Sequence, residues 1–225
     1  MTLVLETNNN GFMCWILELP GAFVRGATKD EVHRKLAGEM AAYAEWLSIP
    51  IPIKDTQHEE LFATIAVVED GDTNILLETD KEPYRNVTDF DRECRLMRLS
   101  SQRVQQTYDK CVNRDVFAPS KMRKTFYGDV HATIEAQYKH IVACQQYYLE
   151  NIGISADVHG HLVASRERVV DAIRAKYQAE GNQLYHGTDE DWTLRKVVRR
   201  IIWHDRIHAR AMNRMNSNSS PVKPR

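Results

Sequence analysis

From about residue 87 onward the apolar positions have the period of helices and keep it. Before that point short strand-like runs, such as Leu3-Val4-Leu5, surround a single helical stretch. After it, apolar residues recur at steps of three and four, the spacing of one helix face. The pattern predicts an α+β, mainly α protein with a small mixed unit over residues 1–84 and a helical unit over residues 85–215. Residues 216–225, rich in Ser, Asn and Pro, are expected to form a disordered tail.

The small unit is predicted to begin with a β-hairpin. The segment Asn8-Asn9-Asn10-Gly11 is a turn signal between the first strand and a second one over residues 12–17. Pro20-Gly21 ends the second strand, and residues 22–25 are expected to form a third. The hairpin and the third strand predict an antiparallel sheet.

A helix is predicted to follow these strands. Thr28 and Glu31 have the spacing of a capping box. The apolar residues of this helix share one face that can cover the sheet; they are Val32, Leu36, Met40, Tyr43 and Leu47. The prolines of Ile49-Pro50-Ile51-Pro52 are expected to end the helix, residues 61–68 to form another strand, and residues 75–77 to form a short strand or an arm.

This order resembles a HicB-like antitoxin domain over residues 3–48. The resemblance is carried by the Asn10-Gly11 hairpin, the Leu19-Pro20-Gly21 break and the segment Gly26-Ala27-Thr28-Lys29-Asp30-Glu31. It implies a unit that binds a protein partner, often with a DNA-binding appendage. No helix-turn-helix pattern or basic ribbon follows in the sequence, so a module used for packing or dimerisation is favoured over antitoxin action.

Four amphipathic helices are predicted in the second unit. The first begins near residue 87, with Thr88 as its cap and Asp91 three residues later. Its apolar seam consists of Phe90, Cys94, Met97, Ser101, Val104, Tyr108 and Cys111. The second follows a linker marked by Pro119 and Gly128, is capped by Asp129, and carries an apolar stripe to a stop near Gly153. The stripe is Val130, Ile134, Ile141 and Tyr148.

The third helix is predicted over residues 162–177, with a stop at Gly181, and the fourth begins after Thr188 or Asp189. The apolar residues of the fourth are Leu194, Val197, Val198, Ile201 and Ile202. Because each apolar stripe must be covered by another, we expect a four-helix bundle.

Composition excludes several classes of partner. Lys and Arg (30) nearly balance Asp and Glu (31), giving a net charge of -1, so no nucleic-acid partner is expected. The chain has neither an apolar run of about 20 residues nor a secretory signal, so a cytoplasmic protein without a membrane span is expected. The cysteines lack C-x-x-C spacing and are expected to be reduced thiols in cores; they are Cys14, Cys94, Cys111 and Cys144.

His204 and His208 are the strongest candidates for chemistry in the chain. Four residues apart on a helix, they lie one turn apart on one face. That face is the apolar one, since Val197 and Ile201 precede His204 at helical steps and Ala211 follows His208. A metal ion would satisfy two inward imidazoles at once. The alternative is an ordinary surface or core pair.

A third ligand must come from another helix, and His140 is best placed because it lies at the edge of the second helix's apolar stripe. His131, nine residues earlier, is half a turn out of phase and is expected to face solvent. His159 and His161 are expected to be exposed, and His33, His58 and His186 have no partner spacing.

Several neighbours of these histidines leave alternatives open. Cys144, one turn after His140, is either a fourth ligand that closes the site or a core filler. Asp205 either accepts a hydrogen bond from a ligand or faces another helix or solvent. The basic residues of the fourth helix are expected to be a solvated face; they are Arg195, Lys196, Arg199 and Arg200.

Over residues 87–213 the chain resembles the DinB-like metal-binding family, also called YfiT-like. The resemblance is carried by Lys139-His140-Ile141 through Tyr147-Tyr148-Leu149 and by the segment from Trp192 to His208. It implies that His140, His204 and His208 are the ligands, with the remaining coordination positions open to water. Known members include thiol-dependent transferases and isomerases, and others are assigned as hydrolases.

Together these features predict a divalent-metal-dependent enzyme, of the thiol-dependent transferase or hydrolase type, acting on a small molecule. Imidazole donors favour zinc or nickel. A homodimer is expected, partly from the resemblance and partly from apolar surface on the first bundle helix and around Trp192. The alternative is a non-enzymatic, metal-stabilised binding or stress-response module whose HicB-like domain binds a partner.

Overall fold

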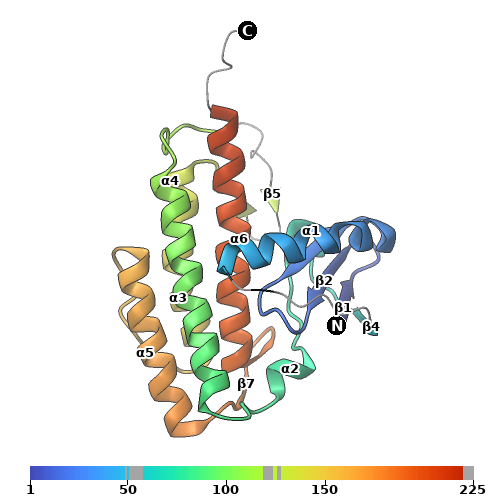
Figure 1. Cartoon of the computed structure of the whole chain (residues 1–225), viewed down its shortest axis with the longest axis vertical. Helices are drawn as coiled ribbons and strands as arrows, with labels where there is room; N and C mark the ends of the chain where they lie inside the picture. The colour runs from blue at the N-terminus through green and yellow to red at the C-terminus, as the bar shows by residue number, and fades with distance from the viewer. Residues whose placement is uncertain (49, 51–57, 119–123, 126–127, 220–225) are drawn as a thin grey trace.

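The chain is α+β and mainly α, as predicted. The computed structural model describes residues 1–48, 50, 58–118, 124–125 and 128–219. Within these ranges, a bundle of helices stands beside a small sheet, and helix α1 (Lys29–Leu47) lies crosswise to the bundle helices (Figure 1). Among the described helices, none is both long and apolar enough to span a membrane.

The sheet consists of β1 (Thr2–Thr7), β2 (Phe12–Ile16), β3 (Phe23–Gly26) and β4 (His58–Ala63), in the order β3-β2-β1-β4. The predicted hairpin is confirmed, because β1 and β2 pair antiparallel with Leu3 opposite Ile16 and Thr7 opposite Phe12. Strand β3 extends the sheet antiparallel to β2, whereas β4 pairs parallel to β1.

The sheet is covered on both faces. One face of the sheet packs in the same hydrophobic cluster as the apolar side of α1. The sheet residues on this face are Leu3, Leu5, Cys14, Ile16 and Val24. The other face packs against Trp203 and against Ile75 and Leu77; its members are Val4, Met13, Trp15 and Phe23. Alternate residues of a strand point to opposite faces, and here both sets are apolar because both faces have a partner.

Helix α1 begins as predicted. The Thr28 side chain accepts a hydrogen bond from the backbone N–H of Glu31 (3.2 Å), and the Glu31 carboxylate accepts one from the N–H of Ala27 (2.8 Å). The helix ends at Leu47, and Ser48 adopts a left-handed conformation (φ 52°). Of the two prolines predicted to end it, Pro50 follows the helix, and Pro52 lies in residues 51–57, outside the described residues.

The strand predicted over residues 61–68 is displaced. Strand β4 spans His58–Ala63, and Val68–Asp70 form a short 3-10 turn instead. Residues 75–77 are an arm and not a strand, because Ile75 and Leu77 pack their side chains onto the sheet face instead of pairing with an edge. The arm leads into the short helix α2 (Glu78–Lys81).

The four-helix bundle is confirmed. It consists of α3 (Val87–Asp109), α4 (Ile134–Glu150), α5 (Leu162–Glu180) and α6 (Leu194–Ser219). Helix α6 packs against α3 and α4, and α5 packs against the same two helices, so the four form a closed ring. Gly181 ends α5 at the predicted position, with a φ of 72°.

Two helices have a different N-cap from the one predicted. Helix α3 is capped by Asn86, which accepts from the N–H of Asp89 (3.0 Å), and not by Thr88. Helix α4 is capped by Thr133, which accepts from the N–H of Ala136 (3.0 Å). In both helices the oxygen of a neighbouring side chain, and not that of the predicted cap, accepts the hydrogen bond from an unpaired N–H of the first turn.

Short strands occupy the positions where two of these helices were expected to begin. Asp129, the predicted cap of α4, lies in strand β6 (Gly128–Asp129), which pairs with β5 (Lys124–Thr125). Pro119 of the same linker lies outside the described residues. Before α6, the strands β7 (Leu184–His186) and β8 (Asp191–Thr193) form a hairpin.

Helix α6 therefore begins later and ends later than predicted. The hydroxyl of Thr193 accepts from the N–H of Lys196 (3.1 Å) and caps its first turn. Its last residue is Ser219, so the first residues of the expected tail are helical. Residues 220–225 lie outside the described part of the chain.

The predicted solvated face of α6 is wrong for three of its four cations. Three of them, Lys196, Arg199 and Arg200, are buried. They are covered by residues 73–80, a segment that contains the arm and most of α2. Arg199 pairs with Asp80 (Nε to Oδ1, 3.0 Å), Lys196 donates to the carbonyl of Asn74 (3.1 Å), and Arg200 donates to that of Thr73. Arg195 is only partly buried. Through these contacts the small unit and the bundle pack as neighbours, while their division into domains stays a prediction.

Candidate metal centre

Helices α4 and α6 bring three imidazoles together. The Nε2 atom of His204 lies 3.1 Å from Nε2 of His140 and 3.0 Å from Nε2 of His208. One ligand atom from each of the three residues lies within 4.8 Å of the others, so the group could hold a metal ion. The three histidines chosen from the sequence are thus the ones that the fold gathers.

The rotation of α6 about its axis is set by the two charged residues that follow His204, which point in different directions around the helix. Asp205 and Arg166 of α5 form a doubly hydrogen-bonded pair (2.9 and 3.1 Å), and each is only 1% exposed. Arg206 pairs on another side with the buried Glu39 of α1. Because Asp205 faces α5 and Arg206 faces α1, His204 is left facing α4. Asp205 therefore serves the interface between helices, one of the two roles expected for it.

Burial favours the neutral, metal-binding form of two of the imidazoles, those of His140 and His204. Desolvation lowers the pKa of His204 well below its ordinary value, and His208 and His140 lower it further. Burial and the neighbouring His131 lower the pKa of His140 to about 4. Metal ligation requires an unprotonated ring nitrogen. These rings therefore need lose no proton at neutral pH before they bind an ion.

A bound cation would satisfy the ring nitrogens of the three histidines better than hydrogen bonds among them can. A neutral imidazole has one N–H and one lone pair. The Nε2 atom of His204 faces two other Nε2 atoms, and a proton there would satisfy only one of them. An ion bound to three nitrogens at about 2.0–2.1 Å would satisfy all three and hold them roughly 3.3 Å apart in a tetrahedral arrangement. The observed separations are close to that value.

Cys144 approaches the group from one side. Its Sγ lies 3.5 Å from both ring nitrogens of His140, and equal distances place the sulfur over the ring instead of along a lone pair. Burial raises the pKa of the thiol to about 11. In the arrangement described, Cys144 packs on a ligand, and its role as a fourth ligand stays open.

The expectation for His131 is wrong. It is partly buried, and its ring centroid lies 4.2 Å from that of His140. The helical phase used to place it does not apply, because α4 begins only at Ile134 and His131 precedes the helix. His159 and His161 are exposed, as expected. The remaining histidines pair with carboxylates away from the site; they are His33, His58 and His186.

Two further residues of the site were missed in the sequence. Gln137 is buried on α4 and hydrogen-bonds with Nδ1 of His208. The ring of Tyr148 lies 5.9 Å from that of His204. The sequence spacing could have identified both, because Gln137 precedes His140 by three residues and Tyr148 follows it by eight, which places them on the same face of a helix.

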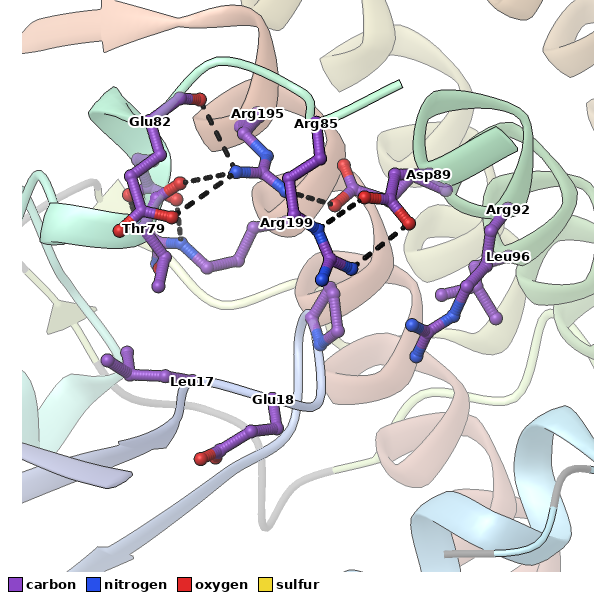
Figure 2. A pocket seen from close by; sticks show the side chains of 13 residues that line it. Leu17, Glu18, Thr79, Glu82, Arg85, Asp89, Arg92, Leu96, Arg195 and Arg199 are labelled. Carbon is purple, nitrogen blue, oxygen red and sulfur yellow. Dashed lines mark hydrogen bonds and ion pairs between the residues drawn. The ribbon is translucent and has the colours of Figure 1, made fainter. Parts of the chain in front are cut away.

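A polar cavity of about 360 Å³ lies elsewhere, between the turn after β2, α2, the start of α3 and the start of α6 (Figure 2). Figure 2 shows Arg85 facing Asp89, to which it donates at 2.7 Å. Arg195 lies 3.5 Å from Glu93, and Arg199 pairs with Asp80. Because these cations already have carboxylate partners, the histidine group is the better candidate for chemistry.

Comparison of the chain with protein-family models, with curated proteins and with solved structures found no match in any of the three. The arguments for function therefore rest on the residues of this chain and on their geometry.

Proposed function

We propose that this chain is a DinB-like metal-binding protein in which His140, His204 and His208 coordinate one divalent ion. The observation that carries the proposal is the convergence of three Nε2 atoms inside a helical bundle. The four-helix architecture, with one ligand from α4 and two from α6, is what the resemblance implies. The adjoining sheet and α1 have the order expected of a HicB-like unit.

Zinc or nickel is the metal that we propose. All three donors are imidazole nitrogens, which suit late first-row ions, whereas magnesium and calcium prefer shells of oxygen ligands. The group identified in the described residues contains no carboxylate. Which of the two ions is bound depends on availability in the cell.

We propose that the protein is an enzyme of the thiol-dependent transferase or hydrolase type, acting on a small molecule in the cytoplasm and without a nucleic-acid partner. Three protein ligands with open positions are typical of catalytic sites. The bound ion would lower the pKa of a water or thiol, or polarise a carbonyl. The protein's own contribution is to hold the three imidazoles close together, with His204 buried and the other two partly buried.

A second candidate function follows from the position of Cys144. If its thiolate joined the three imidazoles, the site would be closed, as in structural zinc sites. Its contact with His140 makes this arrangement reachable by a small movement of the side chain. The protein would then be a metal-stabilised binding or stress-response module whose HicB-like unit binds a partner.

Metal content and affinity of the purified full chain test the proposal. We expect one equivalent of zinc or nickel per chain, and zinc should raise the melting temperature of the parent protein. His208→Ala should weaken zinc binding more than about 100-fold, because a direct ligand matters at least as much as the groups that orient it. His159→Ala changes an exposed histidine and should bind like the parent. Finding only calcium or magnesium at full occupancy would exclude this ligand set.

X-ray absorption of the zinc-loaded protein separates the two candidate functions. Three nitrogens with one or two light oxygen ligands would support the open, catalytic site. A sulfur ligand that disappears in Cys144→Ser would support the closed site.

We also propose a homodimer. Trp192 itself is buried, but two apolar side chains beside it are exposed: Tyr147, whose ring lies 5.8 Å from that of Trp192, and Leu184 on the strand that pairs with β8. Val87 on α3 and Leu61 on β4 are exposed as well. Light scattering should give the mass of two chains; the mass of one chain over a wide concentration range would contradict it.

A further inference from the structure

Gln137 connects three parts of the chain at the metal centre. It lies on α4, one turn before His140, and is only 2% exposed. Its Nε2 donates to the backbone carbonyl of His131 (2.5 Å), and its Oε1 hydrogen-bonds with Nδ1 of His208 on α6. Both polar atoms of the buried amide are therefore used.

The carbonyl of His131 determines which way the amide faces. A carbonyl oxygen only accepts hydrogen bonds, so the –NH₂ group of Gln137 must be the atom that faces it. The amide oxygen, which also only accepts, then faces Nδ1 of His208. Nδ1 must donate and so carries the proton of the ring. In the neutral ring, Nε2 consequently has the lone pair, and it faces Nε2 of His204 at 3.0 Å.

We propose that Gln137 is a positioning residue that holds His208 in the tautomer whose Nε2 carries the lone pair that binds the metal ion. The hydrogen bond also fixes the plane of the ring, because Nδ1 and Nε2 are attached to the same rigid imidazole. An amide achieves this without adding charge, so the ligand set stays neutral. The link to His131 further ties the geometry of His208 to the segment before α4.

The metal-binding part of this inference rests on the proposed function, whereas the tautomer belongs to the metal-free chain and is measurable without any ion. Gln137→Met keeps the length of the side chain but removes both its acceptor and its donor. Gln145→Met is a matched control. Gln145 is equally buried on α4, but it bonds Ser165 and Arg166 and no histidine.

Long-range ¹⁵N–¹H spectra of the histidine-labelled, metal-free full chain report the tautomer. At about pH 8, where imidazoles are neutral, His208 of the parent and of Gln145→Met should have its proton on Nδ1. Gln137→Met should show a mixture of tautomers or a proton on Nε2. A parent protein with the proton on Nε2, or an unchanged tautomer in a folded Gln137→Met, would overturn the assignment. The parent spectrum alone decides the matter if that variant does not fold.

Zinc affinity, measured by competition with a chelator, gives the second readout. Gln137→Met should weaken binding about 10–100-fold, the usual effect of losing a hydrogen-bond partner of a ligand. Gln145→Met should bind like the parent. Parent-like affinity in Gln137→Met would overturn the positioning role. If neither the parent nor Gln145→Met bound zinc, the proposed function would fail, and the tautomer would still decide the role of Gln137.

Discussion

At the scale of single residues, burial decides what each of the nine histidines can do. His159 and His161 face solvent. His140 and His204 lie inside the bundle, where desolvation disfavours the charged ring and lowers the pKa. The same burial that prepares these two rings for a metal ion has a consequence for the stability of the metal-free protein.

We expect the metal-free protein to lose stability as the pH falls below 6.5. The pKa of His140 drops from 6.5 in the unfolded chain to about 4 in the folded protein, so the unfolded state binds more protons between these values. Unfolding is therefore favoured progressively from pH 6.5 down to about 4. The loss from His140 alone amounts to about 2 kcal/mol at pH 5, and His204 acts in the same direction.

Urea unfolding at several pH values, with a chelator present, measures this effect. His140→Gln, which cannot titrate in this range, should reduce the pH dependence. His159→Ala should retain that of the parent, because His159 is exposed. An equal pH dependence in the parent and in His140→Gln would show that folding does not lower the pKa of His140.

A second prediction at this scale concerns Gly21, which has a φ of 80° in the turn before β3. A Cβ atom there would lie 2.7 Å from the backbone nitrogen of Trp203. Gly21→Ala should therefore cost about 2–4 kcal/mol through strain and overpacking. In the middle of α1, by contrast, no atom of the described residues lies within 4 Å of a Cβ built at Gly38. Gly38→Ala should stabilise by about 0.5–1 kcal/mol. Thermal unfolding of both variants tests the contrast, and equal effects would contradict the close packing of the turn on α6.

At the scale of elements, α6 organises the molecule because three of its charged residues form ion pairs with three different helices. Asp205 pairs with Arg166 of α5, Arg206 with Glu39 of α1, and Arg199 with Asp80 of α2. Buried ion pairs add little net stability, but they penalise any arrangement that leaves one charge alone. They therefore select one rotation of α6, and that rotation turns His204 and His208 toward α4.

We expect Asp205→Ala to destabilise the protein by about 3–5 kcal/mol, because Arg166 would remain buried with its charge uncompensated. Glu167 of the same helix as Arg166 pairs with Arg98 at 2.6 Å but is 45% exposed. Glu167→Ala should cost less than about 1 kcal/mol, since solvent compensates the remaining charge. Chemical denaturation measures both values. A small effect of Asp205→Ala would mean that Arg166 finds another partner or reaches water.

At the scale of the whole molecule, one hydrophobic cluster runs through both parts of the chain. It contains Leu5 and Cys14 of the sheet, Tyr43 of α1, Phe90 of α3 and Val197 of α6. Separation of the two parts would expose this surface to water. The area shared between them opposes independent unfolding.

We therefore predict a single cooperative unfolding transition. Tryptophan fluorescence reports on both parts of the chain, because Trp15 and Trp46 lie in the first and Trp192 and Trp203 in the second. The rings of Trp15 and Trp203 lie 5.9 Å apart across the contact between the parts. Far-UV circular dichroism reports mainly on the bundle. The two signals should change at the same urea concentration. Two separate transitions would instead show residues 1–84 and 85–215 to be independently folding units.

The sequence by itself determined those features that depend on residues close together in the chain. The hairpin follows from its turn residues, the capping of α1 from Thr28, and the four amphipathic helices from apolar residues at steps of three and four. The pairing of His204 with His208 has the same origin, because one helical turn brings residues i and i+4 together. Helix starts were less well determined, since several neighbouring side chains could serve as the cap.

Only the tertiary structure decided what depends on distant segments. Three basic residues close together on α6 are what a solvated helix face usually contains; they are Lys196, Arg199 and Arg200. They are nevertheless buried, because residues 73–80, more than 110 positions earlier in the chain, cover them. His131 approaches His140 because the chain before α4 is not helical. Gln137 meets His208 only when α4 and α6 pack side by side. Local periodicity states which face of a helix is apolar, whereas the element that covers each face is chosen by the packing of the whole chain.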